Sequence, residues 1–144
     1  MTYRAHEFSG YFRRSLAAIE SQGEAGVARV ALLDALIARP IDAASIERAG
    51  AAALASALEH RASGADPDAA GAGVARGLRQ LRQCLIMALA ERDIRGEASL
   101  EEVCSAMNAF AACATREALH QAGAEVAARH GRALDAQGAP QDLL

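Results

Sequence analysis

Hydrophobic residues in the N-terminal part of the chain recur at spacings of three and four, the period of an α-helix with one buried face. This pattern predicts a first helix over residues 3–21, which the glycine-containing stretch Gly23–Gly26 interrupts. A second apolar stripe starts at Val27 and stops at Arg39. It stops there because Pro40 disfavours helical geometry in the residue that precedes it. We therefore expect two helices at the start of the chain.

The next stretch predicts a third helix and then the one clear internal loop. Asp42 or Ser45 can cap the third helix, because both residue types accept hydrogen bonds from free amides at a helix start. The helix should end near Arg61. Ser63–Gly73 is rich in Gly, Asp and Ala, contains a proline and has few large side chains, so we expect it to be a mobile loop.

The strongest periodicity comes after this loop and predicts a central helix that ends at Gly96. Residues along its inner seam step by four and three: Val74, Leu78, Leu81, Leu85, Ala88 and Arg92. Ser99 and Glu102 then have the spacing of a capping box, in which each side chain accepts a hydrogen bond from the other residue's amide. A fifth helix should run from there to about His130.

The inner face of the fifth helix is expected to pack on the central helix. Its candidate residues are Val103, Met107, Phe110, Ala114, Ala118 and Val126. We expect Leu78, Leu81, Leu85, Met107 and Phe110 to be largely buried between these two helices. Gly131 should end the fifth helix, and the segment after it has no periodicity.

These elements predict an all-α fold, a single helical bundle of about five helices with a disordered C-terminal tail. No stretch alternates with period two for long enough to be a strand. Residues 1–132 would form the bundle, and residues 133–144 would be a connector, expected to be mobile.

Composition narrows the function classes. The 144 residues include 38 alanines, which favours closely packed helices, and all 15 basic residues are arginine. The net charge of −3 and the 3% of aromatic residues disfavour nucleic-acid binding. No apolar run reaches the roughly 18 residues of a membrane span, so we expect no membrane partner and a cytoplasmic protein. Cys84, Cys104 and Cys113 have no metal-site spacing and are interpreted as structural thiols.

The residues themselves point to no catalytic site. The four histidines lie far apart in the sequence, and no phosphate-binding glycine motif is present. Glu101 and Glu102 are the one close pair of carboxylates, and they stand at a predicted helix start. Helix capping and the helix dipole explain acidic residues at such a position. We therefore expect no catalytic residue, no metal site and no cofactor held by this chain alone.

The arginines of the central helix are the remaining candidates for chemistry. Arg76, Arg79 and Arg82 follow one another at three-residue spacing, and Arg92 stands beside Asp93 further along. A guanidinium group suits phosphate or carboxylate, so Arg79, Arg82 and Arg92 are candidate contacts for an anion or a partner. The alternative is a solvated helix face with ordinary ion pairs.

The segment from Leu78 to Ile94, LRQLRQCLIMALAERDI, resembles the arginine-rich helix of glutamate-ammonia-ligase adenylyltransferases, which typically reads like LRRFRRREMLRIAWRDLLG. The LEEV start of the next helix and the later ARHG and DAQGAP segments are also similar to that family, so the resemblance spans about residues 74–144. The residues that match in the arginine-rich helix are Leu78, Arg79, Arg82, Ala90, Arg92, Asp93 and Gly96. Arginines frequent in the family are replaced by Gln83, Cys84 and Ala88.

The resemblance implies an N-terminal helical fragment of a bifunctional enzyme that regulates nitrogen assimilation. Such enzymes transfer AMP from ATP to a tyrosine of glutamine synthetase, and they remove it again by phosphorolysis. The cofactors that the resemblance implies for the whole enzyme are ATP and magnesium. The resemblance implies as partners the downstream catalytic domain of the same chain, glutamine synthetase and the PII signalling protein. This segment would be structural or a docking site, not catalytic.

A self-contained helical adaptor for protein interactions is the alternative function. The two hypotheses make different predictions about the gene beyond the codon for Leu144. An open reading frame that continues into a glycine-rich turn and an Asp-x-Asp pair is expected for the enzyme fragment, and a stop codon is expected for the adaptor.

Overall fold

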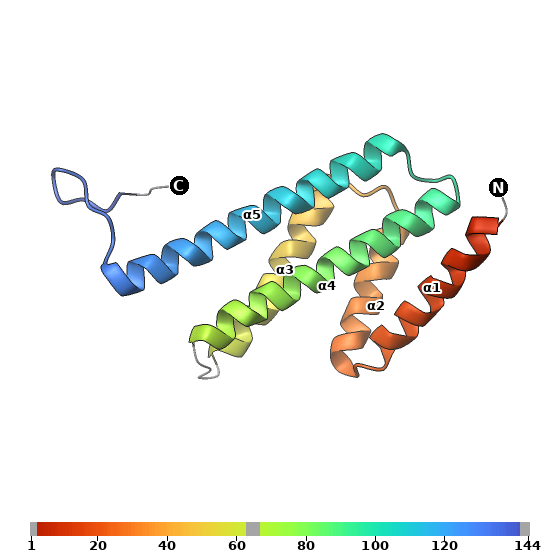
Figure 1. Ribbon diagram of the computed structural model, residues 1–144, viewed down its shortest axis with the longest axis horizontal. Helices are drawn as coiled ribbons and strands as arrows, with labels where there is room; N and C mark the ends of the chain where they lie inside the picture. The colour runs from red at the N-terminus through yellow and green to blue at the C-terminus, as the bar shows by residue number, and fades with distance from the viewer. Residues whose placement is uncertain (1–2, 63–66, 142–144) are drawn as a thin grey trace.

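The computed structural model describes residues 3–62 and 67–141, and these residues form five α-helices (Figure 1). The described residues contain no strand, only one isolated bridge between Leu134 and Pro140. The helices are α1 (Tyr3–Glu20), α2 (Glu24–Ile37), α3 (Ala43–Ala62), α4 (Pro67–Ile94) and α5 (Leu100–His130). The prediction of an all-α fold with about five helices is confirmed.

Helix α4 begins earlier than the sequence pattern predicts. Within the expected loop Ser63–Gly73, residues 67–73 already belong to α4, and residues 63–66 lie outside the described residues. Pro67 stands at the first helical position, where its missing N–H costs no hydrogen bond and its fixed φ suits the helix. The alanines in this first part of α4 are strong helix formers, and they outweigh its two glycines.

Helix α4 is the centre of the bundle, and its main neighbours are α3 and α2. Helix α5 packs mainly on α3 and touches α4 much less, while α1 lies against α2 (Figure 1). Leu81 and Leu85 of the predicted seam are buried, as is Phe110 of α5, but Leu78 and Met107 are only half-buried. The expectation that the seam is buried chiefly between α4 and α5 is wrong, because α2 and α3 cover most of it.

The core consists mainly of aliphatic side chains from the five helices and the α2–α3 turn, together with one aromatic ring. Six of its residues come from α4, which explains the strength of the sequence periodicity there. The buried residues of this core are Ile19, Leu33, Leu36, Ile41, Ile46, Ala49, Leu81, Cys84, Leu85, Met87, Ala88, Leu89, Ala106 and Phe110.

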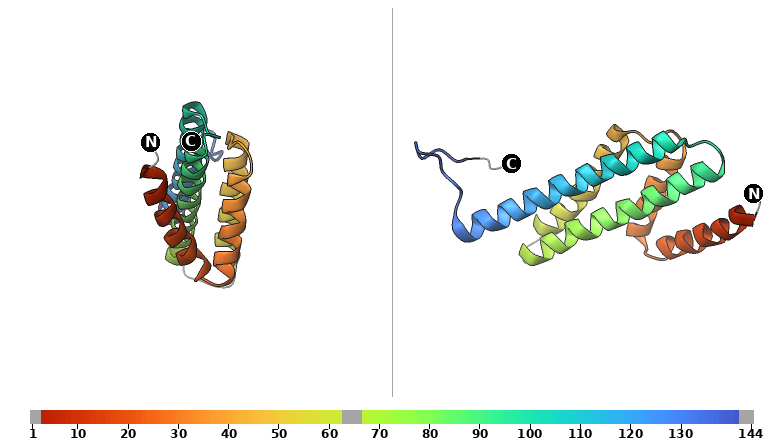
Figure 2. Two further views of the ribbon diagram at one scale, coloured as in Figure 1. Left: turned by 90° about the vertical axis from the view of Figure 1, so that its right-hand side faces the viewer. Right: turned by 45° about the horizontal axis from the view of Figure 1, so that its top comes forward.

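The C-terminal half of α5 extends beyond the other helices (Figures 1 and 2). Ala118 and Val126 are exposed there, Val126 to 57%, so the expectation that they lie on or near the inner face is wrong. Ala114, nearer the bundle, still packs against the core. The difference arises because α5 is longer than the surface on which it packs. None of the helices in the described ranges is long and apolar enough to cross a membrane.

The described part of the C-terminal segment contains a hydrogen-bonded turn, which is more local structure than the sequence predicts. The Asp135 Oδ1 atom accepts hydrogen bonds from the amides of Gln137 (2.9 Å) and Ala139 (2.8 Å). The Gln141 amide donates to the carbonyl of Ala133 (2.8 Å). Residues 142–144 lie outside the described residues. The mobility of residues 133–144 remains a prediction.

Two glycines shape the corner between α1 and α2. Gly23 has a φ of 65°, which a residue without Cβ adopts without strain in this tight turn. Gly26 lies inside α2, and a Cβ atom there would collide with the carbonyl oxygen of Ile19. The close approach of α1 and α2 therefore requires a glycine at position 26.

Candidate functional site

Arg92, one of the three candidate contact residues, is buried at the C-terminal end of α4, with only 4% of its surface exposed. Its guanidinium group donates to the Glu102 carboxylate through Nε (3.1 Å) and Nη2 (3.4 Å). It also donates to the carbonyls of Ile37 and Glu97, each at 3.1 Å, and its Nη1 lies 3.5 Å from the Glu97 carboxylate. Acceptors of the protein therefore surround every nitrogen of this side chain.

The partners of Arg92 belong to several elements that meet at this end of the bundle. Ile37 ends α2, Glu97 lies in the turn between α4 and α5, and Glu102 is in the first turn of α5. The backbone carbonyl of Arg92 also accepts from the Glu97 amide (2.8 Å). Arg92 consequently joins these three elements through hydrogen bonds within the protein, and its expected contact with an anion or a partner stays a prediction.

Glu102 has a different role from the one that the capping box predicts. The Ser99 side chain accepts a hydrogen bond from the Glu102 amide (3.1 Å), so this half of the box is confirmed. The Glu102 carboxylate, however, accepts from Arg92 and from the amide of Ile41 (2.8 Å), in the turn before α3. The other half of the box is therefore replaced by a tertiary contact.

The environment of Glu102 favours its charged form. Burial alone would raise the pKa of this carboxyl, but the hydrogen bonds from Arg92 and the Ile41 amide, with the guanidinium charge, lower the pKa below its ordinary value. A cation and an anion thus stabilise each other inside this corner. The ion pair is compensated by additional hydrogen bonds, which a buried pair needs in order to stabilise a fold.

Arg79 and Arg82, the other two candidate residues, are exposed on α4, as is Arg76. None of the three has a hydrogen bond or ion pair within the described part of the chain. Ile86, one turn further along, is 41% exposed on the same side of the helix. We call these four residues the α4 arginine face. The structure therefore brings Arg79 and Arg82 together and separates them from Arg92.

A second buried arginine, Arg29 of α2, is not among the residues that the sequence pattern singles out. It is 8% exposed and donates to the side-chain carbonyls of Gln22 and Gln83, each at 2.6 Å. Its Nε atom is buried without a hydrogen-bond partner. Among the described residues no carboxylate lies within ion-pair distance of its guanidinium group.

The apolar stripe predicted for α2 does not include Arg29. That stripe begins with Val27, but Val27 is 69% exposed, whereas Gly26, Arg29, Leu33 and Leu36 are buried. These buried positions also step by three and four, so the sequence does contain the signal. This buried stripe is recognised in the sequence only when an arginine is accepted as a residue that can face the core.

The cysteines differ in environment, and all three are free thiols. Cys84 is fully buried, and its burial raises the pKa of the thiol, which agrees with a structural role. Cys113 is half-buried, and Cys104 is exposed. The prediction of structural packing is therefore confirmed for Cys84. The Cys113 sulfur also packs closely against Gly50 of α3, whereas Cys104 does not share this environment.

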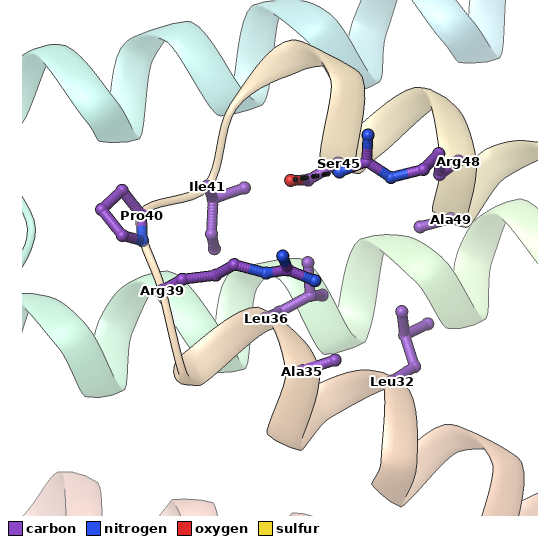
Figure 3. Close-up of a pocket in the computed structure, with 9 residues that line it drawn as sticks. All are labelled: Leu32, Ala35, Leu36, Arg39, Pro40, Ile41, Ser45, Arg48 and Ala49. Carbon is purple, nitrogen blue, oxygen red and sulfur yellow. Dashed lines mark hydrogen bonds between the residues drawn. The ribbon is translucent and has the colours of Figure 1, made fainter.

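A pocket of about 210 Å³ lies at the corner between α2 and α3 (Figure 3). Leu36, Ile41 and Ala49 form its buried apolar floor, and the exposed Arg39 and Arg48 stand at its rim. No group of three or more His, Cys, Asp or Glu that could hold a metal ion occurs among the residues with described placement.

Comparison with known proteins identifies the family. The model of the glutamate-ammonia ligase adenylyltransferase family matches residues 17–144. A bifunctional glutamine synthetase adenylyltransferase/adenylyl-removing enzyme from Ralstonia nicotianae is 42% identical over 84 residues, which are 58% of this chain and 8% of that protein. The protein of the same name from Thioalkalivibrio sulfidiphilus is 31% identical over 111 residues, 77% of this chain and 10% of that protein.

A third relative with this name, from Bordetella pertussis, is 41% identical over 68 residues, 46% of this chain and 7% of that protein. The chain thus spans about a tenth or less of the length of these relatives. No solved structure matches it significantly. Because the family model covers most of the chain, from within α1 to its last residue, this chain belongs to the glutamate-ammonia ligase adenylyltransferase family.

Proposed function

We propose that this chain is the N-terminal helical segment of a longer bifunctional glutamine synthetase adenylyltransferase/adenylyl-removing enzyme. That enzyme would transfer AMP to a tyrosine of glutamine synthetase and remove it by phosphorolysis. The family match over residues 17–144 carries this proposal. The small share of each relative that the chain covers supports its being one segment of the longer enzyme.

The segment itself would be structural or a docking site. Nucleotidyl transfer depends on carboxylates and backbone amides that position phosphates and metal ions. The described residues offer no such carboxylate cluster, and Glu102 is already engaged with Arg92. Residues for ATP and magnesium would therefore belong to the catalytic part of the longer enzyme.

The α4 arginine face would be the contact surface of this segment. Arg76, Arg79 and Arg82 supply three exposed cations without partners in the described part of the chain, and Ile86 adds an apolar contact. Such a surface suits an acidic region of a protein. The downstream catalytic domain is the proposed occupant, with glutamine synthetase and the PII signalling protein as further proposed partners of the enzyme, in the cytoplasm.

Activity of the isolated chain and of a longer protein tests the proposal. We expect the 144 residues alone to release no AMP from adenylylated glutamine synthetase, and a polypeptide that also contains the downstream domain to release AMP when phosphate is added. Release by the isolated chain at a rate near that of the longer protein would contradict the non-catalytic role. Inactivity of a well-folded longer protein would contradict the enzyme assignment and favour the adaptor.

The arginine face is tested in the longer protein. Arg79→Ala combined with Arg82→Ala should slow phosphate-dependent AMP release or loosen the domain contact, measured by limited proteolysis between the domains. Arg14→Ala combined with Arg116→Ala is the matched control, because it removes two exposed arginines at other places and neither is beside the connector. Equal behaviour of the two double variants would reject the face as a contact surface.

A further inference from the structure

The α2–α3 pocket is a small hollow that is open to solvent and has an apolar floor and a polar rim. Its floor side chains, Leu36, Ile41 and Ala49, are all buried and belong to the packed core, so the floor is rigid. Its volume of about 210 Å³ exceeds the roughly 150 Å³ in which benzene is accommodated. The pocket can therefore receive one aliphatic side chain with a polar group beside it.

The rim of this pocket is positively charged. Arg39 has no hydrogen bond or ion pair within the described part of the chain, and Arg48 has only a hydrogen bond to Ser45 Oγ (3.3 Å). Figure 3 shows the two guanidinium groups extending toward the same space above the floor. Two cations without an ion pair among the described residues thus face one opening, while the charge of Arg48 also acts on the nearby Asp42 carboxylate.

The neighbouring carboxylates have closer partners than Arg39 and Arg48. Asp42 caps α3, where its Oδ1 accepts from the Ser45 amide (2.7 Å) and the Ser45 hydroxyl (2.6 Å). These hydrogen bonds, with a smaller contribution from the positive charge of Arg48, hold the pKa of Asp42 below its ordinary value. Glu47, the next acid along α3, lies 3.7 Å from Arg116. Neither acid forms an ion pair with Arg39 or Arg48.

We propose that the α2–α3 pocket binds a peptide segment of a protein partner, with an aliphatic side chain on the apolar floor and a neighbouring Asp or Glu carboxylate between Arg39 and Arg48. Charge complementarity selects the carboxylate. The open mouth favours a peptide over a free small molecule, because small-molecule sites usually bury 70–90% of the ligand surface. The proposal does not rest on the enzymatic activity of the longer protein.

Selection from a displayed random-peptide library on the immobilised chain, with fluorescence anisotropy of the enriched peptides as the second step, tests this pocket. We expect enriched sequences to place Asp or Glu beside Leu, Ile or Val. Binding should weaken about tenfold in Arg39→Gln and in Arg48→Gln, and it should fall as salt is added. Ala35→Phe should block the pocket without changing its charge, since Ala35 lines it.

Arg132→Gln is the matched control, because it removes an exposed arginine far from the pocket in sequence and should leave peptide binding unchanged. All of these positions are exposed, so folding should be retained, and circular dichroism verifies it. The proposal is overturned if no peptide is enriched, or if the enriched peptides lack an acidic residue. It is also overturned if the Arg39→Gln and Arg48→Gln variants bind the peptides as tightly as the native chain. If the small aliphatic carboxylate isocaproate competes as strongly as the peptide, the occupant is a small molecule and the proposal is overturned. If the chain self-associates and Ala35→Phe abolishes this, the occupant is a second copy of the chain, which also overturns the proposal.

Discussion

Helix α4 contains arginines in two opposite environments. Arg92 is buried at the end of the helix and contacts α2, the α4–α5 turn and α5 through its guanidinium group. Arg76, Arg79 and Arg82 lie in the middle of the same helix with their side chains exposed. Residue type alone therefore does not separate a structural arginine from a candidate contact residue.

The helical phase separates them. Arg92 comes eleven residues after Leu81, which is about three turns, so both point to the core. Arg79 and Arg82 fall outside that seam. An arginine on the buried seam must find acceptors inside the protein, because an unpaired charge there is costly. An arginine off the seam remains hydrated and available to other molecules.

Replacement of Arg92 should have the largest effect on stability. Arg92→Met keeps the aliphatic stem but leaves the Glu102 carboxylate without its cation, and breaking such a pair costs about 3–5 kcal/mol. Urea denaturation monitored by circular dichroism measures the loss. Arg79→Met on the exposed face is the control and should change stability by no more than about 0.5 kcal/mol. Similar losses in the two variants would contradict the distinction between them.

Truncating one apolar side chain on the buried side of α4 and one on its exposed side extends the comparison between these two sides. Leu81→Ala should cost about 2–5 kcal/mol, because Leu81 is fully buried and its removal leaves a cavity. Ile86→Ala, on the exposed side, should cost well under half as much. The same denaturation experiment gives both values. A loss of stability for Ile86→Ala larger than that for Leu81→Ala would show that the exposed side of α4 is covered in solution.

Acidification should weaken the Arg92 corner specifically. Because the pKa of Glu102 is lower in the folded protein than in the unfolded chain, the stabilisation is present at neutral pH and is lost as the pH falls below the ordinary glutamate value of 4.5. Glu102→Gln should therefore be less stable than the native chain at neutral pH. The stability difference between the two proteins should shrink toward acid pH. A difference that is independent of pH would refute this role of Glu102.

Replacement of the other buried arginine, Arg29, should have a much smaller effect than replacement of Arg92. Arg29 contacts two neutral amides and leaves its Nε without a partner, so its burial is poorly compensated. Arg29→Met should change the free energy of unfolding by less than about 1 kcal/mol in either direction. Thermal denaturation of this variant beside Arg92→Met gives the comparison. A loss as large as that of Arg92→Met would mean that an anion pairs with Arg29 in solution.

Much of the fold arises from local patterns in the sequence. The end of α2 before Pro40, the cap at Ser99 and the end of α5 at Gly131 agree with the structure, because each depends on residues within one turn. The start of α4 differs because helix propensity and a proline at the first position outweigh the glycines there. Of the apolar stripe predicted for α2, Leu33 is buried and Val30 and Ile37 pack against the core. Only Val27 is exposed, because the buried side of α2 is turned toward Arg29.

The sequence by itself determined the helices, their approximate ends and the family, since periodicity, capping residues and similar segments are properties of a linear chain. Only the tertiary structure decided that Glu102 contacts Arg92 and Ile41, that Arg39 and Arg48 share one pocket, and that the second half of α5 is exposed. These contacts join residues from different helices. Their formation depends on how the helices pack, which the spacing within one helix does not specify.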